Sequence, residues 1–185
     1  MAEESLSAAT RRIPGSGGVR VVLSIILAGL ARVAQAQMLL KPRVTSIPAV
    51  YLVLIRQQRE ILMALRSNTG YRDGFWSFPA GHLEERESPH QAMVREAKEE
   101  LDIGLDASDL SLAHSMWRAT PEAQGGRLDF FFTATRWTGT PVNGEPGKCA
   151  RIAWWPLDRL PTPLIPEVAQ AIAALQKGLG YSEVH

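Results

Sequence analysis

The sequence predicts one domain with a mixed β-sheet and few helices, in the α/β or α+β class. Segments rich in β-branched, aromatic and other apolar residues have the length of strands, and the clearest of them is 127–137. Two further segments, 88–101 and 166–180, carry the periodicity and the start signals of helices. The chain of 185 residues is long enough for one domain with a substantial core.

The first half of the predicted sheet is a run of strands. Residues 46–58 predict a strand, and 60–67 follow after a polar break as its hairpin partner or continuation. Residues 68–74 contain Asn, Asp and two glycines, which predict a turn. A short aromatic strand at 75–81 is stopped by Pro79 and Gly81.

The second half follows the first helix. A strand is predicted from about Leu110, then the strand at 127–137, a loop at 138–148 and a strand at 149–157. The last helix begins at Pro166, which suits a first turn, and stops at Gly178. It is predicted to close the chain, with a core stripe of Val168, Ile172 and Leu175.

Residues 1–40 are predicted to be an N-terminal extension, disordered or helical, to a domain at 41–185. Val21 to Ala31 is an apolar run of signal-peptide length, and Ala34 to Ala36 matches a cleavage site. The run is too short to span a bilayer. It could be a secretory signal, an amphipathic helix, or an extension upstream of a natural start at Met38, which is the alternative we favour. We therefore expect a cytoplasmic protein, or an exported one if residues 20–36 act as a signal.

The composition argues against several classes of protein. The formal net charge is +1, which does not indicate a strongly basic nucleic-acid-binding protein. The single cysteine, Cys149, excludes an internal disulfide framework, and we interpret it as a small buried apolar residue. No cluster of His and Cys has the spacing of a zinc site.

The helix at 88–101 begins with strong local signals. Ser88 can act as the N-cap, Pro89 fits the first helical position, and Gln91 completes a capping box. The stripe predicted to face the core consists of Val94, Ala97 and Leu101.

The same helix places three carboxylates on one face. Glu96, Glu99 and Glu100 stand at i, i+3 and i+4, where like charges repel by a few tenths of a kcal/mol per pair. Such a face is either a solvated surface or a site for a hard cation such as Mg²⁺ or Mn²⁺, which prefer oxygen ligands. Helical spacing alone leaves both interpretations open.

The residues around this helix decide between them. Gly81, Glu87 and the segment Arg95 to Ile103 resemble the Nudix box, G-x5-E-x7-R-E-U-x-E-E-x-G-U, in which U is a bulky aliphatic residue or Ala. Every fixed position matches except the second glycine, which is Asp102. The chain therefore resembles the Nudix hydrolase superfamily, and the resemblance implies an α/β/α sandwich with a mixed sheet from about Ile47 to Leu175.

The resemblance also implies roles for single residues. Glu96, Glu99 and Glu100 match the family's divalent-metal ligands, and Gly81 matches a glycine whose carbonyl often joins them. The expected cofactor is Mg²⁺ or Mn²⁺. Glu87 and Arg95 match a pair that holds the loop against the helix. Expected catalytic carboxylates are Glu99, Glu100 and, outside the box, Glu145 as a base or further ligand.

The implied reaction is attack by water on phosphorus in a nucleoside diphosphate linked to another group, such as an ADP-ribose-like compound or a nucleotide sugar. The alternatives are a house-cleaning (d)NTP pyrophosphohydrolase and a non-catalytic nucleotide-binding regulator. We expect a small nucleotide substrate, no membrane partner and no nucleic acid except capped RNA; a homodimer is compatible with the resemblance. The substrate-binding residues stay unassigned, although base-stacking and phosphate-binding candidates exist: Tyr71, Trp76, Trp117, Phe131, Arg56 and Arg118.

Asp102 departs from the pattern at the position where the helix ends. If the backbone there is left-handed, Asp tolerates it better than most residues but less well than glycine. We expect Gly104 to take over the turn, so that Asp102 is a local variation beside an intact site.

Overall fold

The computed structural model describes residues 26–32 and 44–185. The chain divides into two units, Met1–Arg43 and Val44–His185, and the predicted boundary after residue 40 stays a prediction. In the first unit, residues 26–32 form a helical turn with exposed apolar side chains, whereas Ala34 to Ala36 and Met38 lie outside the described residues. None of the helices in the two described ranges has the length and apolarity needed to cross a membrane.

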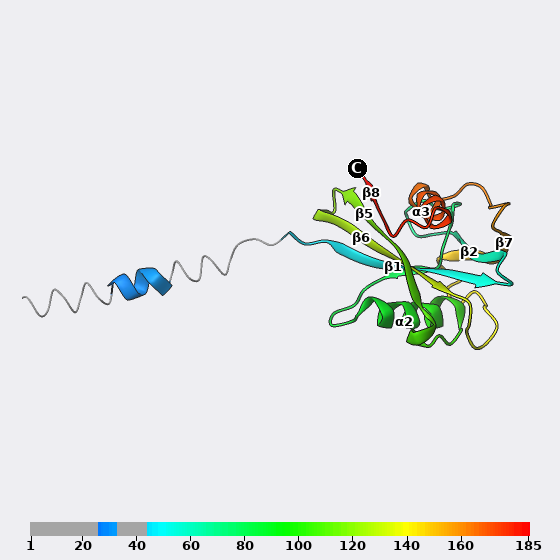
Figure 1. Ribbon diagram of the computed structural model, residues 1–185, viewed down its shortest axis with the longest axis horizontal. Coiled ribbons are helices and arrows are strands. Elements are labelled where there is room, and N and C mark those ends of the chain that lie inside the picture. Colours follow the sequence, from blue (N-terminus) through cyan, green and yellow to red (C-terminus); the bar gives the residue numbers. More distant parts are fainter. Residues whose placement is uncertain (1–25, 33–43) are drawn as a thin grey trace, which may run out of the picture. The chain divides into compact units, whose positions relative to one another are not determined.

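The second unit is built on a mixed sheet of eight strands (Figure 1). The strand order is β3-β2-β1-β6-β5-β8, with β4 paired to β1 and β7 paired to β2. The pairs β1–β6 and β5–β8 are parallel and the others are antiparallel, as expected for a mixed sheet. The strands are β1 (Ile47–Arg56), β2 (Glu60–Arg66), β3 (Trp76–Ser77), β4 (Ala80–His82), β5 (Ser111–Thr120), β6 (Ala123–Ala134), β7 (Cys149–Pro156) and β8 (Tyr181–Val184).

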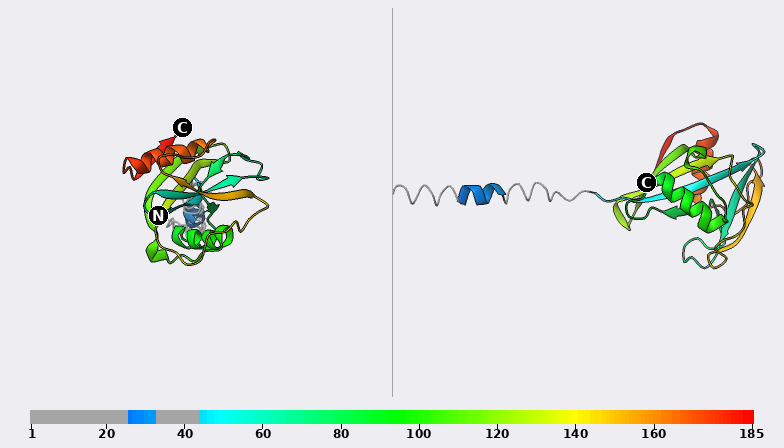
Figure 2. Two further views of the ribbon diagram at one scale, coloured as in Figure 1. Left: turned by 90° about the vertical axis from the view of Figure 1, so that its right-hand side faces the viewer. Right: turned by 90° about the horizontal axis from the view of Figure 1, so that it is seen from below.

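Helices cover both faces of the sheet, which confirms the predicted α/β/α sandwich. Helix α2 (Pro89–Leu101) lies on one face and helix α3 (Pro166–Gln176) on the other, and a 3-10 turn, η1 (Ala107–Asp109), follows α2 (Figures 1 and 2). Strand β1 shows why two layers form: Val50, Leu52 and Leu54 face the α2 cluster, and Val53 faces the α3 cluster. Each such buried side chain stabilises the fold by about 1.5–3 kcal/mol.

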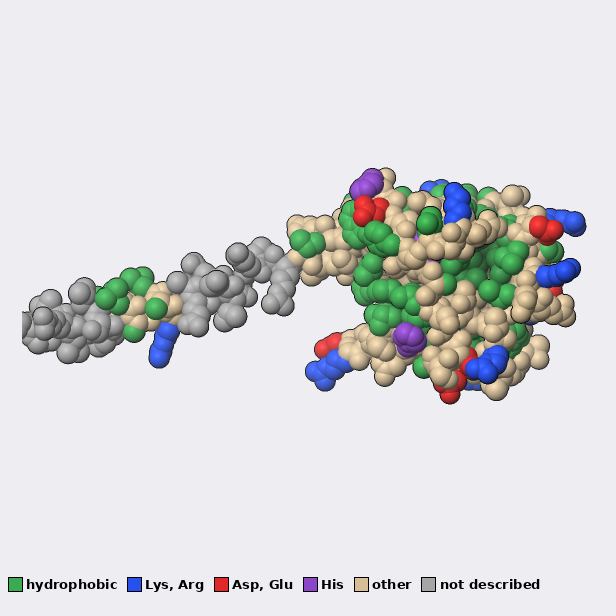
Figure 3. Space-filling model, in the orientation of Figure 1, with side chains coloured by type: hydrophobic (Ala, Val, Ile, Leu, Met, Phe, Trp, Pro, Cys, Tyr) green, Lys and Arg blue, Asp and Glu red, His purple; other side chains and the backbone are tan. Residues whose placement is uncertain are grey.

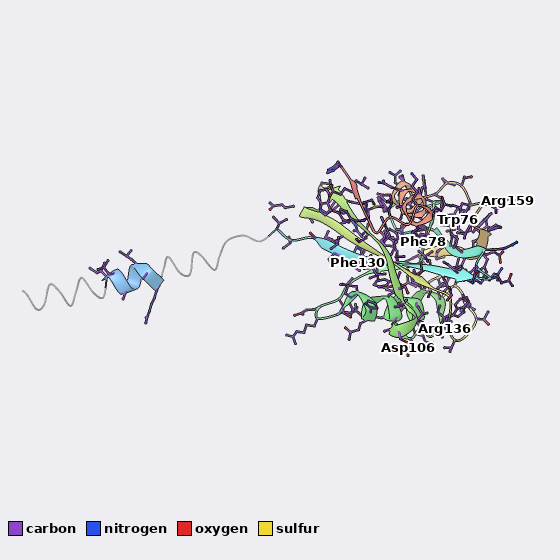
Figure 4. All side chains as sticks on the ribbon, viewed as in Figure 1. Trp76, Phe78, Asp106, Phe130, Arg136 and Arg159 are labelled. Atoms are coloured by element: carbon purple, nitrogen blue, oxygen red, sulfur yellow. The ribbon has the colours of Figure 1, made fainter. Side chains whose placement is uncertain are left out.

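Most predicted elements are present, with differences at their edges. The segment 75–81 forms two short strands, because Pro79 cannot donate a ladder hydrogen bond. Trp76 and Phe78, beside that break, belong to the layer between the sheet and α3 (Figure 4). Strand β6 begins at Ala123, before the predicted residue 127, and β8 follows the helix that was expected to close the chain.

The core-facing stripes of the two helices are close to those predicted. In α2, Ala97 and Leu101 are fully buried, but Val94 is only half-buried, and Ala92 and Met93 enter the core beside them. In α3, Val168 and Ile172 are buried and Leu175 packs at the edge of the same cluster. Gly178 has a φ of +67°, which agrees with its predicted role as the helix stop.

The surface carries no strong concentration of charge on the face drawn in Figure 3. On this face of the unit Val44–His185, acidic and basic side chains are interspersed among apolar and neutral surface.

Candidate active site

Helix α2 is fixed at its start by the predicted capping box. The Gln91 backbone N–H donates to the Ser88 hydroxyl over 3.3 Å, and the Ser88 N–H donates to the Gln91 side-chain oxygen over 2.9 Å. Pro89 occupies the first turn, where a missing N–H costs nothing. These hydrogen bonds fix the residue at which α2 begins. They therefore determine which residues of its later turns face the loop before the helix.

Glu96 lies directly against Gly81. The carboxylate is buried, and a Cβ built on Gly81 would stand 1.8 Å from Glu96 Oε1. Only glycine leaves that space open at this position. Burial raises the pKa of Glu96, while the neighbouring Arg95 guanidinium opposes the rise.

Arg95 joins the loop to the helix. Its guanidinium donates to both oxygens of Glu87, over 2.9 Å each, and to the backbone carbonyl of His82 over 3.0 Å. The same group contacts Glu96 over 2.7 Å and Glu99 over 3.1 Å. Arg95 lowers the pKa of Glu87. This geometry is what a loop-supporting pair requires.

Glu100 is held by a backbone group of β4. Its carboxylate accepts a 2.8 Å hydrogen bond from the Ala80 backbone N–H. Burial raises the pKa of Glu100 to about 8, and the negative charges of Glu96 and Glu145 add to the rise. A cation beside the Glu100 carboxylate would favour its charged form and lower this pKa.

The loop at 138–148 brings Glu145 to the same place. Its backbone is bonded to the end of α2, since the Gly144 N–H donates to the Glu100 carbonyl over 2.8 Å. A Cβ on Gly144 would stand 2.1 Å from the Glu99 carbonyl, so glycine permits this close approach. The Glu145 carboxylate accepts from Lys148 over 2.8 Å.

One cavity of about 580 Å³ is lined by Arg95, by Lys148 and by the carboxylates that these two side chains contact in α2 and in the loop at 138–148. Its lining includes the five predicted metal-binding or catalytic residues, Gly81, Glu96, Glu99, Glu100 and Glu145. Cys149, expected to be buried, is instead half-buried in the wall, and its partial burial raises the pKa of the thiol.

The donor set fits a hard divalent cation by its chemistry. The carboxylates supply oxygen ligands only. The Glu96 carboxylate lies so close to residue 81 that only glycine fits there without displacing it. Within residues 26–32 and 44–185, however, no three acidic, His or Cys side chains already surround a single point that could hold an ion. The physical reason is that Arg95 lies between Glu96 and Glu99 and neutralises them itself.

Asp102 is itself the left-handed residue at the end of α2. Its φ is 53° and its ψ is 30°, and its N–H donates to the helix carbonyls of Ala97 and Lys98. Gly104 does not take over the turn, contrary to expectation, because it is not among the residues with positive φ. Gly104 instead exchanges two backbone hydrogen bonds with Thr138 and anchors the following loop.

A second cavity of about 560 Å³ adjoins the first. Arg66, Ser77 and the strand β4 line both. Three of the sequence's substrate candidates, Tyr71, Arg118 and Phe131, line the second cavity, and the Phe131 ring stacks on that of Tyr51.

The remaining candidates, which are two tryptophans and one arginine, do not line this cavity. Trp76 is buried in the core, and the Trp117 indole donates to the Gly125 carbonyl over 2.8 Å. Arg56 pairs with Glu60 and lies over Trp154.

Sequence reasoning missed a charged group behind the second cavity. Asp129 is fully buried in β6 and accepts from Arg118 over 2.6 Å, and Glu167 accepts from Arg118 over 2.9 Å. An Asp inside the apolar run "RLDFFFTA" was the available signal, because a charge on a buried strand needs a partner.

Comparison with known proteins gives the class. The model of the NUDIX domain matches residues 45–175, which is well over half of the chain. An 8-oxo-dGTP diphosphatase of Proteus vulgaris is 33% identical over 97 residues, covering 52% of this chain and 82% of that protein. An 8-oxo-dGTP diphosphatase of Escherichia coli K12 is 27% identical over 120 residues, covering 64% and 90%.

A solved structure agrees with the sequence comparison. The crystal structure of a MutT NUDIX hydrolase from Burkholderia pseudomallei superimposes with a TM-score of 0.63 at 25% identity, covering 70% of this chain and 97% of that one. The chain belongs to the NUDIX family. It is a Nudix hydrolase, an enzyme that acts on phosphoric anhydride bonds of small nucleotides, and such enzymes generally need a divalent metal.

Proposed function

We propose that this enzyme hydrolyses nucleoside triphosphates, oxidised ones included, to a nucleoside monophosphate and pyrophosphate. The observation that carries the proposal is the pair of adjoining cavities. One is lined by the α2 carboxylates, and the other has an aromatic wall and arginines. A triphosphate against the carboxylates leaves its nucleoside within reach of the second cavity.

The choice of a triphosphate draws support from the relatives. Two proteins that this chain matches over most of their length are named 8-oxo-dGTP diphosphatases. Our expectation from the sequence, an ADP-ribose-like or nucleotide-sugar substrate, is the rival. The homodimer and the cytoplasmic location stay predictions.

Mg²⁺ or Mn²⁺ is the cofactor in this proposal, with Glu96, Glu99, Glu100 and the Gly81 carbonyl as its holders. When bound, the cation would neutralise the phosphate oxygens and make water a better nucleophile. Arg95 keeps Glu96 and Glu99 oriented and ties them to Glu87. Glu100 is fixed by the Ala80 N–H.

The base that accepts the proton of the attacking water is proposed to be Glu145. It comes from a different element than the ligands, and it lines the same cavity on a loop that is hydrogen-bonded to the end of α2. Lys148 holds one of its oxygens. Glu100 and Glu99 are the competing bases. If Glu145 is the base, Glu145→Gln lowers kcat by roughly 10²–10⁴-fold without weakening cation binding, whereas Gln at Glu99 or Glu100 weakens cation binding as well.

The decisive experiment is a hydrolysis screen in Mg²⁺ and in Mn²⁺, with the products separated by anion-exchange chromatography, because pyrophosphate and phosphomonoesters, not free phosphate, are the expected products. Substrates are the common and 8-oxo deoxynucleoside triphosphates, ADP-ribose, NADH, dinucleoside polyphosphates and capped RNA. We expect triphosphates to be cleaved with the highest kcat/KM. A preference for ADP-ribose would replace this proposal by its rival, and binding without any product would indicate the non-catalytic regulator.

A matched pair of variants tests the site itself. Glu99→Gln should lower metal-dependent kcat by roughly 100-fold or more while the circular dichroism spectrum stays unchanged. Glu85→Gln is the control, because this carboxylate belongs to the same box segment but is almost fully exposed. Equal activity of the two variants would contradict the assignment of Glu99.

A further inference from the structure

One arginine that lines the second cavity has donors that the protein does not use. Arg127 on β6 lines this cavity, and its side chain is 20% exposed. Among residues 44–185, its terminal nitrogens Nη1 and Nη2 donate to no group, and they are not among the buried polar atoms that lack a partner, as Nε is. The terminal nitrogens are therefore accessible, and the cavity offers their N–H groups to a ligand.

Asp129 orients the Arg127 guanidinium. This fully buried carboxylate lies between two arginines: its Oδ2 accepts from Arg118 Nε over 2.6 Å, and its Oδ1 lies 3.7 Å from Arg127 Nε. The Nε side of Arg127 thus faces the buried charge, and the accessible nitrogens form the outer end of the group. Arg118 also donates to Glu167 over 2.9 Å, so Arg127 is the arginine of this pair with donors to spare.

The charges of this network already cancel. Arg118 and Arg127 contribute two positive charges, and Asp129 and Glu167 contribute two negative charges. A phosphate at Arg127 would bring further negative charge toward a buried carboxylate, whereas a neutral acceptor completes the hydrogen bonds of Arg127 and leaves the charge balance unchanged. A neutral group with acceptor atoms is therefore the favoured ligand.

The cavity has space for a ring beside Arg127. In the sheet, Ala49 of β1 pairs with His82 of β4 on one side and with Asp129 of β6 on the other, and the small Ala49 side chain leaves space above these strands. The half-exposed ring of Tyr71 lines the same cavity. Nucleobases are flat rings that pack against aromatic side chains, and their keto oxygens are neutral acceptors that arginine binds.

We propose that Arg127 determines base specificity: its terminal N–H groups donate to a keto oxygen of the substrate's nucleobase, and Asp129 is the positioning residue for Arg127. The inference rests on the proposed function, since the base is that of the nucleotide substrate. The ligand class is the bases with a keto group at the recognised edge, namely guanine, hypoxanthine, uracil and thymine. Adenine and cytosine carry an amino donor there instead, which cannot accept from Arg127.

Binding of monophosphates tests this without any turnover. Calorimetry in Mg²⁺ would compare IMP with AMP and UMP with CMP, because the members of each pair differ only at the keto or amino group and at the ring nitrogen beside it. The wild type should bind the keto member of at least one pair about tenfold more tightly. Equal affinity within both pairs, a preference for the amino members, or no binding of any of the four would overturn the inference.

Substitution then assigns the preference to Arg127. Arg127→Met keeps an apolar stem without donors and should reduce the tenfold preference to about twofold or less. Arg127→Lys keeps the charge beside Asp129, so it serves as the test if the Met variant does not fold, and its smaller donor group should leave an intermediate preference. Arg159→Met is the matched control, because it removes an exposed arginine that lines neither of the two cavities, and it should keep the wild-type preference. A wild-type preference in the folded Arg127 variants would overturn the assignment.

Pyrophosphate distinguishes a base contact from a phosphate contact. The wild type and Arg127→Met should bind pyrophosphate with Mg²⁺ equally, because pyrophosphate has no keto group. If Arg127→Met instead bound pyrophosphate, IMP and AMP all about tenfold more weakly, with the IMP preference unchanged, Arg127 would be a phosphate ligand and the inference would be overturned.

Turnover separates this inference from the proposed function. The same preference should appear in kcat/KM for ITP against ATP and for UTP against CTP. If no triphosphate is cleaved while the monophosphates still show a preference that depends on Arg127, the proposed function fails and the specificity role stands. If triphosphates are cleaved without discrimination and the monophosphates bind equally, the function stands and the specificity role fails.

Discussion

At the scale of single residues, the space opposite Glu96 is the sharpest constraint in the site. A methyl group on Gly81 would overlap the Glu96 carboxylate, and this carboxylate is the end of a flexible side chain that can move away. We expect Gly81→Ala to leave the folding free energy almost unchanged and to lower kcat roughly 10- to 100-fold, because Glu96 is displaced by about 1 Å or more.

The measurement for Gly81→Ala is steady-state kinetics beside a thermal melt. Gly147→Ala is the control, since a Cβ there meets nothing within 4 Å. Full activity of Gly81→Ala would mean that the position of Glu96 does not limit the reaction.

Asp102 allows a second test at this scale. Asp102→Gly relieves a left-handed conformation in a residue with a Cβ and removes an exposed contact with Lys98. The first effect is worth about 1 kcal/mol and the second about 0.3–0.5 kcal/mol in the opposite sense, so the melting temperature should stay equal or rise slightly. Turnover should be similar; a large fall in kcat would reveal a role for Asp102 in the reaction.

At the scale of elements, β8 depends on a buried histidine. His114 on β5 is fully buried, and its Nδ1–H donates to the Leu179 carbonyl over 2.7 Å. In the neutral ring, Nε2 then accepts from the Ser182 hydroxyl over 2.9 Å. The hydrogen bonds of one side chain thus fasten both the approach to β8 and the strand itself.

Ser182→Ala should therefore destabilise the domain by about 1–3 kcal/mol, the cost of leaving a buried acceptor without a donor. Urea unfolding would measure this. Ser115→Ala removes a hydroxyl from the same strand pair at an exposed position and should cost less than about 0.5 kcal/mol. Equal stability of the two variants would show that water replaces the Ser182 hydroxyl.

The elements also explain why a helix tolerates three neighbouring carboxylates. The repulsion among Glu96, Glu99 and Glu100 is offset by Arg95 on one side and by the Ala80 N–H on another. Ala80 belongs to β4, and Arg95 belongs to α2 itself and is bonded to Glu87 in the loop between them. The acidic face is therefore stabilised from the strand and from the loop together.

At the scale of the whole molecule, the unit Val44–His185 contains both core clusters and both cavities. We expect the chain from Met38 to His185 to have the same melting temperature and kcat/KM as the full-length chain, because it retains every one of these contacts. A chain that begins at Leu52 is the negative control, since it lacks half of β1, which pairs with three other strands. A drop of several degrees for the Met38 form would show that residues 1–37 contribute to the stability of the domain.

Local sequence patterns predicted much of the fold. The strands at 46–58, 60–67 and 149–157 and both helices were predicted within a few residues, because β-branched runs, Pro89, Ser88 and Gly178 act on the chain next to them. Strand β8 was not predicted, because "YSEV" is short and polar and becomes a strand only through pairing with β5. The start of β6 was misplaced for a similar reason, since Gly125 and Gly126 lower its local preference for strand.

The sequence by itself determined the family, the sandwich and the acidic face of α2, because the box spacing and helical periodicity are properties of neighbouring residues. Tertiary structure decided what no local pattern records. It set Glu145 beside the end of α2, made Asp102 and not Gly104 the left-handed residue, and joined Asp129, Arg118 and Glu167 from β6, β5 and α3. Those contacts depend on strands and helices distant in sequence meeting across the sheet, and only folding fixes their distances.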